Sequence, residues 1–96
     1  MATLTPDQIA DQLKPLAGWE YHANSIRKLY RFKGFLDGIR FIDRIAELAE
    51  AADHHPDIFV NYTRVTFTCS THSAGGVTAA DFRLATQIED EFAGRG

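Results

Sequence analysis

Residues 58–70 read IFVNYTRVTFTCS, and this stretch predicts a pair of β-strands. From Arg64 to Ser70 apolar and polar residues alternate, which is the pattern of a strand with one buried face. The preceding strand is expected from Ile58 to Tyr62, with a tight turn near Tyr62-Thr63. Because so short a link joins antiparallel strands, the start of the first strand lies beside the end of the second.

A long helix is expected before this pair of strands. Apolar residues recur at helical spacing from Ile39 to Ala52, and their wide face suggests burial on more than one side. Asp37 is the expected N-cap residue. The helix should end near Ala52, because Pro56 disfavours the helical conformation at His55.

The N-terminal third predicts a helix followed by two short strands. Thr5 is a capping residue, Pro6 suits the first helical position, and Gln8 completes a capping box. Gly18 is expected to end this helix. The two strands, residues 19–23 and 26–32, are expected around a turn at Asn24-Ser25.

The C-terminal third predicts a loop and then a helix. Residues 73–77 contain Gly75-Gly76 and are expected to form the loop. Thr78 is expected to cap the last helix, with Asp81 at the capping-box position. An apolar stripe at helical spacing then follows, formed by Phe82, Ala85, Ile88 and Phe92.

The order of these elements is α-β-β-α-β-β-α, which defines an α+β fold class. Two strand pairs with short links predict a four-stranded antiparallel sheet, with the helices packed on one face. The length of 96 residues fits a single domain over residues 1–96. The other face of the sheet, or an edge strand, would remain available for self-association.

Composition excludes some classes of function. The net charge of −3 excludes a chain that binds nucleic acid by its overall charge. A local basic cluster is interpreted as the solvent face of a hairpin; its members are Arg27, Lys28, Arg31 and Lys33. Cys69 is the one cysteine, so no internal disulfide forms, and its place in an alternating strand predicts a small buried residue.

The expected location is the cytoplasm. One unpaired cysteine indicates a reducing compartment. The first residues, MATLTPDQIADQL, lack the basic and apolar regions of a signal peptide, and no apolar run reaches transmembrane length.

Three histidines are expected to meet at one end of the sheet. His54 and His55 stand where the long helix leads into the third strand, and His72 stands just beyond the fourth. Imidazole both donates and accepts protons near neutral pH, so these groups suit a reaction that needs an acid and a base. Glu50 lies one helical turn before His54 and could touch it if the helix continued that far, and Asp53 adjoins the pair. Both carboxylates are therefore candidates for orienting the imidazoles.

Two other interpretations of the histidines stay open. Adjacent histidines can serve only to cap a helix C-terminus, where positive charge is favoured. Three histidines can also bind zinc, but neighbours in an extended chain seldom reach one ion, and no CxxC or HExxH pattern is present, so no metal is expected. His22 lies outside the group and is expected on a strand surface.

Residues 50–81 read EAADHHPDIFVNYTRVTFTCSTHSAGGVTAAD and resemble the signature of the pterin-4a-carbinolamine dehydratases. Many fixed positions and four separations agree, and weaker similarity extends over nearly the whole chain. The matching elements are Glu50, His54-His55-Pro56, Tyr62, His72 and Asp81.

The resemblance implies an enzyme that removes water from 4a-hydroxytetrahydropterin and gives quinonoid dihydropterin. That product is later reduced for reuse by aromatic amino acid hydroxylases, and no metal or organic cofactor is needed. By position, His54, His55 and His72 are the catalytic histidines. His54 and His72 are assigned mainly to proton transfer, and His55 mainly to holding the pterin.

The resemblance also implies substrate contacts and supporting residues. Glu50 and Asp53 would orient the histidines or contact the pterin, Pro56 belongs to the supporting motif, and Asp81 with Thr78 would be a structural cap that shapes the pocket wall. The implied substrate-binding residues are Asp53, His54, His55, Ser70, Thr71, His72 and Ser73.

The chain departs from the family pattern at two positions. Ile58 stands where members often carry an aromatic residue, which would change a pocket wall. Ala80 stands where many animal members carry arginine, so any role of that arginine is in doubt here.

Two other functions and an oligomeric state also follow from the resemblance. Some animal members bind a transcription factor and aid its dimerisation, so a non-catalytic module is one alternative. A pterin-binding protein of another pathway, such as molybdopterin metabolism, is a second. The family forms dimers and tetramers, so we expect a homo-oligomer, with no direct nucleic-acid or membrane partner.

Overall fold

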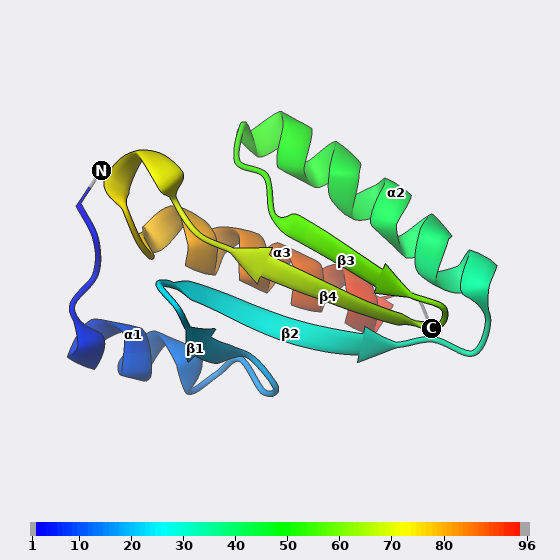
Figure 1. Cartoon of the computed structure of the whole chain (residues 1–96), viewed down its shortest axis with the longest axis horizontal. Helices are drawn as coiled ribbons and strands as arrows, with labels where there is room; N and C mark the ends of the chain where they lie inside the picture. Colours follow the sequence, from blue (N-terminus) through cyan, green and yellow to red (C-terminus); the bar gives the residue numbers. More distant parts are fainter. Residues whose placement is uncertain (1, 95–96) are drawn as a thin grey trace.

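The structure is a computed structural model that describes residues 2–94. Figure 1 shows the order of the elements along the chain, and their bounds are α1 (Pro6–Leu13), β1 (Glu20–His22), β2 (Ser25–Arg31), α2 (Phe35–Ala52), β3 (Asp57–Asn61), β4 (Arg64–Cys69), the short 3₁₀ helix η1 (His72–Ala74) and α3 (Ala79–Gly94). No helix among these residues is long and apolar enough to span a membrane.

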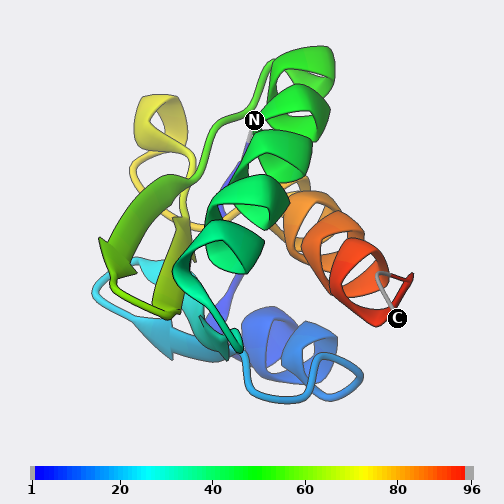
Figure 2. The ribbon, with the colours of Figure 1, turned by 90° about the vertical axis from the view of Figure 1, so that its right-hand side faces the viewer.

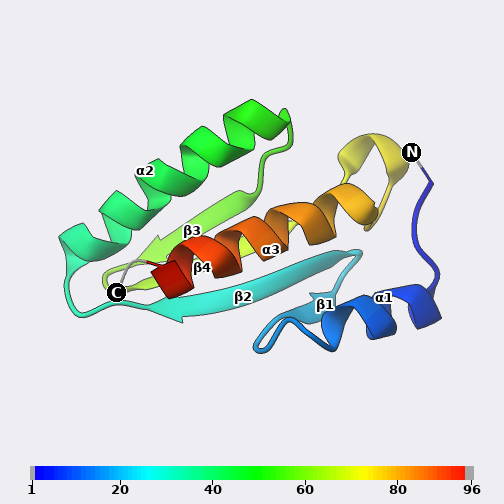
Figure 3. The ribbon, with the colours of Figure 1, turned by 180° about the vertical axis from the view of Figure 1, so that it is seen from behind.

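The four strands form one antiparallel sheet in the order β1-β2-β4-β3. Figure 2 shows the helices on one side of this sheet, and Figure 3 shows α3 crossing in front of β2 and β4. The predicted fold class and element order are therefore confirmed. In the outer hairpin Asn61 pairs with Arg64, so the predicted turn at Tyr62-Thr63 is also correct.

The core lies between this sheet and the helices. Alternate residues of the two central strands, such as Ile26, Tyr30, Val65 and Phe67, are almost fully buried. Tyr30 packs on Phe67 with ring centroids 5.8 Å apart, and on Phe41 of helix α2 at the same distance. Burying each such side chain contributes roughly 1.5–3 kcal/mol. The alternate side chains of β4 are buried as predicted, and their burial holds the sheet against the helices.

Two helix boundaries differ from the sequence prediction. Helix α1 has the predicted capping box but ends at Leu13 rather than at Gly18. Pro15 explains the difference, because it has no N–H to continue the helical hydrogen bonds. Helix α2 begins at Phe35 after Gly34 as N-cap, so Asp37 lies inside the first turn and does not cap it.

The first hairpin turns one residue earlier than predicted. Ala23 and Asn24 both adopt positive φ, at 48° and 62°. Positive φ at both central residues is the geometry of a type I′ turn, which matches the twist of the flanking strands. The turn is therefore Ala23-Asn24 rather than Asn24-Ser25, while His22 lies exposed in β1 as expected.

Lys28 does not belong to the solvent face of the hairpin. Its Nζ lies 2.5 Å from Glu89 Oε1 of α3 and donates to the Ala17 carbonyl at 2.8 Å. The prediction that Lys28 lies on the solvent face was therefore wrong. The long aliphatic part of a lysine side chain allows it to occupy an otherwise apolar strand face. Cys69 is fully buried, as predicted.

Candidate active site

The end of α2 sends two neighbouring histidines in different directions. Asp53 adopts a left-handed conformation with φ of 50°, and its N–H donates to the Glu50 carbonyl. The His54 N–H donates to the Ala49 carbonyl at 3.1 Å. These two bonds form a Schellman motif, which ends the helix and turns the chain sharply. The histidines therefore leave the helix with different partners.

His54 is held by a fully buried carboxylate. Its Nε2 lies 2.6 Å from Asp81 Oδ1 on the first turn of α3. Asp81 Oδ2 accepts from the Thr71 hydroxyl and from the Thr78 N–H, both at 2.9 Å. Because the Thr71 hydroxyl proton goes to Asp81, the Thr78 hydroxyl donates to Thr71 across 2.8 Å. Asp81 thus joins the end of β4, the start of α3 and the end of α2.

This arrangement selects one tautomer of His54. When the Asp81 carboxylate is ionised it only accepts hydrogen bonds, so the neutral ring must carry its proton on Nε2. Nδ1 then has a free lone pair, and within residues 2–94 it has no hydrogen-bond partner. The ring nitrogen left for a substrate is therefore Nδ1.

His55 is paired with a different carboxylate. Its Nε2 lies 2.5 Å from Glu50 Oε1, at an exposed position. A contact between Glu50 and His54 required the helix to continue as far as His54, but α2 ends at Ala52, as expected, and Glu50 contacts His55 instead. In residues 2–94 the Asp53 carboxylate bonds neither histidine.

His72 comes from the loop after β4. The loop is closed by a bridge between Thr71 and Gly76, and Gly75 adopts φ of 78°, which favours glycine. His72 begins the short helix η1, and its exposed ring has no hydrogen-bond partner among residues 2–94. Both of its ring nitrogens are therefore available to a ligand.

One pocket brings the three histidines together. It has a volume of about 260 Å³. The residues that line it are those that the sequence analysis assigned to substrate contact, namely Asp53, His54, His55, Ser70, Thr71, His72 and Ser73. Their roles stay predictions. No group of three His, Cys, Asp or Glu side chains within residues 2–94 is arranged to hold a metal ion.

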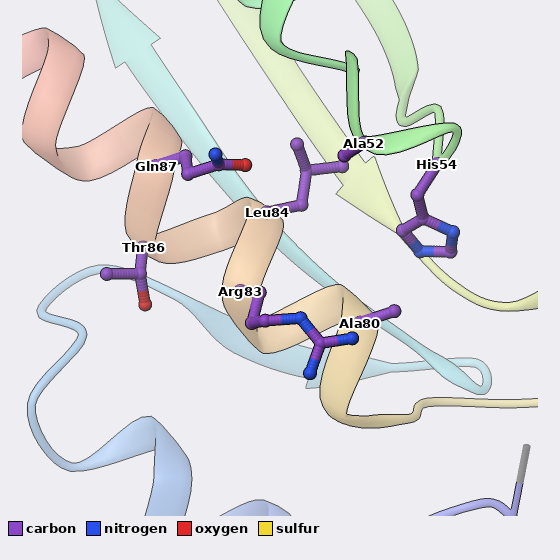
Figure 4. Close-up of a pocket in the computed structure, with 7 residues that line it drawn as sticks. All are labelled: Ala52, His54, Ala80, Arg83, Leu84, Thr86 and Gln87. Atoms are coloured by element: carbon purple, nitrogen blue, oxygen red, sulfur yellow. The ribbon is translucent and has the colours of Figure 1, made fainter. Parts of the chain in front are cut away.

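His54 also lines a second pocket, between the end of α2 and helix α3 (Figure 4). Its volume is about 350 Å³, and it is lined by Ala52, His54, Ala80, Arg83, Leu84, Thr86 and Gln87. Ala80, one of the two departures from the family pattern, is in this wall, whereas Ile58 lies exposed on β3 and lines neither pocket. The sequence analysis did not identify Arg83, because one arginine on a helix gives no local signal.

The structure therefore defines an α+β protein with a candidate acid–base site, in which a buried carboxylate–histidine pair lies beside two further histidines. Comparison with known proteins shows the family. The family model described as pterin 4 alpha carbinolamine dehydratase matches residues 2–91. The chain therefore belongs to the pterin-4a-carbinolamine dehydratase family, a family of hydro-lyases.

Curated relatives match over almost their whole length. A protein of Mycobacteroides abscessus is 50% identical over 91 residues, which are 95% of this chain and 97% of the relative. A protein of Mycobacterium sp. strain KMS is 47% identical over 90 residues, covering 94% and 96% of the two chains. Both are named pterin-4-alpha-carbinolamine dehydratase, as provisional assignments.

Two solved structures share the fold. A transcriptional coactivator/pterin dehydratase from Brucella melitensis has a TM-score of 0.89 at 34% identity, covering 93% of this chain and 97% of its own. A pterin dehydratase-like protein described as a RuBisCO assembly factor of the alpha-carboxysome has a TM-score of 0.62 at 20% identity, covering 76% and 84%. The second likeness shows the fold alone.

Proposed function

We propose that this protein removes water from 4a-hydroxytetrahydropterin to give quinonoid dihydropterin. The observation that carries the proposal is that three histidines line one pocket, one of them held by the buried Asp81 carboxylate. Family membership supports the same reaction. In the cell, reduction of the product would return the pterin to aromatic amino acid hydroxylases, and we propose a cytoplasmic location.

The reaction needs two proton transfers and no change of oxidation state. An acid gives a proton to the C4a hydroxyl, the C4a–O bond breaks, and water leaves. A base takes the proton from the neighbouring ring N–H, and that electron pair forms the new C=N bond. Two positioned groups that exchange protons near neutral pH are sufficient for these steps.

The hydrogen bonds support a division of labour between His54 and His72. The bond from Nε2 to Asp81 leaves a lone pair on His54 Nδ1, which suits a base that takes the ring proton. The Asp81 carboxylate would also stabilise the positive imidazolium that forms. His72 has no partner among the described residues, so it is free to give its proton to the leaving hydroxyl.

His55 is suited to holding the pterin. Its Nε2 is bonded to Glu50, so Nδ1 is the ring nitrogen left for a ligand. Ser70 to Ser73 line the same pocket, and their backbone would offer groups that pair with the amide edge of the ring.

Single-histidine variants test these roles. A phenylalanine hydroxylase reaction would supply the 4a-hydroxypterin, and its loss would be followed by ultraviolet absorbance. We expect His54→Ala and His72→Ala to lower kcat by roughly a hundredfold to ten-thousandfold, which is the usual contribution of a general acid or base. His55→Ala should mainly raise KM.

His22→Ala is the matched control, because His22 is an exposed histidine on β1 that lines neither pocket. It should keep the kcat of the parent protein. Full activity of both His54→Ala and His72→Ala would refute the assignment of proton transfer to this pocket.

A further inference from the structure

The second pocket and the histidine pocket share one lining side chain. His54 lines both of them. The histidine pocket, at about 260 Å³, is smaller than the roughly 300–1,000 Å³ of typical small-molecule sites. The pocket of about 350 Å³ beside His54 would give further space to a substituent on a pterin ring.

Figure 4 shows what this pocket presents to a ligand. The guanidinium of Arg83 extends beside Ala80, on the same side of α3, and Leu84 points toward Ala52. Ala80 has only a methyl group, so the space next to the guanidinium stays open. The side chains of Leu84 and Ala52 make an apolar wall, which suits the carbon atoms of a short chain.

The charge of this pocket favours an anion. None of its seven lining residues is acidic. Within residues 2–94 the Arg83 guanidinium makes no ion pair or hydrogen bond, in contrast to Arg27 with Glu20 and Arg44 with Glu91. A guanidinium has five donors in a planar fork that matches carboxylate and phosphate oxygens.

We propose that the second pocket binds the substituent of a pterin whose ring occupies the histidine pocket, and that Arg83 recognises a carboxylate or phosphate on it. The proposal rests on the proposed function, because it places the ring against the histidines. It makes Arg83 a specificity residue that distinguishes anionic pterins from neutral ones. Gln87, on the next turn, would donate to the same anion or to a hydroxyl of the substituent.

Fluorescence titration with three stable pterins tests the proposal. The probes are 6-methylpterin, pterin-6-carboxylate and the phosphate monoester of 6-hydroxymethylpterin. The parent protein should bind at least one anionic probe roughly tenfold or more tightly than 6-methylpterin, as expected for a charge-assisted hydrogen bond. The anionic probe whose affinity exceeds that of 6-methylpterin by the larger factor identifies the preferred anion.

Variants connect that preference to the arginine. Arg83→Gln should reduce the ratio of the two Kd values to about one, and Arg83→Lys should keep part of it because the charge remains. Arg40→Gln, an exposed arginine of α2 that lines neither pocket, is the matched control and should keep the full ratio.

The outcomes separate this inference from the proposed function. Equal affinities for all three probes, or a preference for anions that survives Arg83→Gln, would overturn the inference alone. If 6-methylpterin binds and His55→Ala weakens it, the ring site stands whatever the result at Arg83. Binding of the anionic probe that is unchanged in His55→Ala but lost in Arg83→Gln would contradict the placement of the ring.

Discussion

At the scale of single residues, Asp81 is the side chain that joins the parts of the candidate site. It is fully buried and bonded to Thr71, Thr78 and His54. Capping the start of α3 and holding His54 are therefore done by the same carboxylate. A change at this position will act on the tautomer of His54 as well as on the helix.

Asp81→Asn is the substitution that separates these two effects. The amide oxygen can still accept from the Thr78 N–H, so the helix cap should survive. The amide NH₂ can donate to His54 Nε2, which would move the ring proton to Nδ1 and remove the base. We expect kcat to fall by roughly a hundredfold or more, within the range of general-base catalysis.

Two measurements accompany this prediction. The midpoint of urea unfolding should change little, and the ¹⁵N chemical shifts of the His54 ring should report the change of tautomer. Unchanged kcat with an altered tautomer would contradict the assignment of Nδ1 as the base.

The residues of the site could be predicted only in part from the sequence. The histidines stand at the ends of elements with clear patterns, so the topology alone placed them at one end of the sheet. The partner of His54 could not be predicted in this way, because Asp81 lies 27 positions away and its spacing indicates only a helix cap. Arg83 has no neighbouring pattern at all.

At the scale of elements, Glu89 connects helix α3 to the sheet. Its Oε1 accepts from Lys28 Nζ and the Tyr30 hydroxyl, both at 2.5 Å, and from Trp19 Nε1 at 3.1 Å. Burial raises the pKa of Glu89, but hydrogen bonds from Lys28 and Tyr30 and the charge of Lys28 outweigh it, so the net pKa is lowered. The pKa of the Tyr30 hydroxyl is raised, chiefly by burial and then by Glu89.

This shift predicts how stability depends on pH. A carboxyl with a lower pKa in the folded state stabilises the fold above its ordinary pKa of 4.5, and this contribution is lost as pH falls through the folded-state pKa. At neutral pH we expect Glu89→Gln to lower the free energy of unfolding by about 1–3 kcal/mol, because the half-buried Lys28 loses its counter-ion.

Urea unfolding of both proteins over a series of acidic pH values checks this prediction. The difference between them should shrink as pH falls below the ordinary carboxyl pKa. A difference that stays constant down to the lowest pH at which both proteins fold would show that the charge of Glu89 has no part in the connection.

The elements themselves were largely predictable, since caps and alternation are local signals. The capping box of α1 and the alternation of β4 were both correct. The boundaries were less so. Pro15 ends α1 because it has no N–H, and α2 starts after Gly34, which has no capping side chain that the sequence could show. The prediction for Lys28 was wrong because its aliphatic stem packs on the apolar face of the sheet while its ammonium group bonds Glu89 and the Ala17 carbonyl.

At the scale of the whole molecule, one edge of the sheet is open and apolar. All five residues of β3 are exposed, including Ile58, Phe59 and Val60, and β3 is the last strand of the sheet. An edge strand with this composition is a template for pairing with another chain. We propose that a second copy of this protein covers it and that the protein is a homo-oligomer.

Phe59→Glu tests this proposal. Its side chain is 66% exposed, so the substitution should leave the fold intact but place a charge in the proposed interface. We expect the dissociation constant to rise by roughly tenfold or more, in keeping with the loss of one buried aromatic side chain. Sedimentation velocity over a range of concentrations measures the change.

Tyr21→Glu is the control for this experiment, because Tyr21 is an exposed aromatic residue on β1 at the opposite edge. This variant should keep the oligomeric state and the dissociation constant of the parent protein. A parent protein that sediments as a monomer at micromolar concentration would contradict the oligomer.

The measurement that tests the central claim most directly is the decay rate of 4a-hydroxypterin with and without this protein. The parent protein should accelerate the decay, the His54→Ala/His72→Ala double variant should reduce it nearly to the uncatalysed rate, and His22→Ala should match the parent. If the folded parent protein gives no acceleration, or the double variant keeps the full rate, the three-histidine pocket is not a dehydratase site.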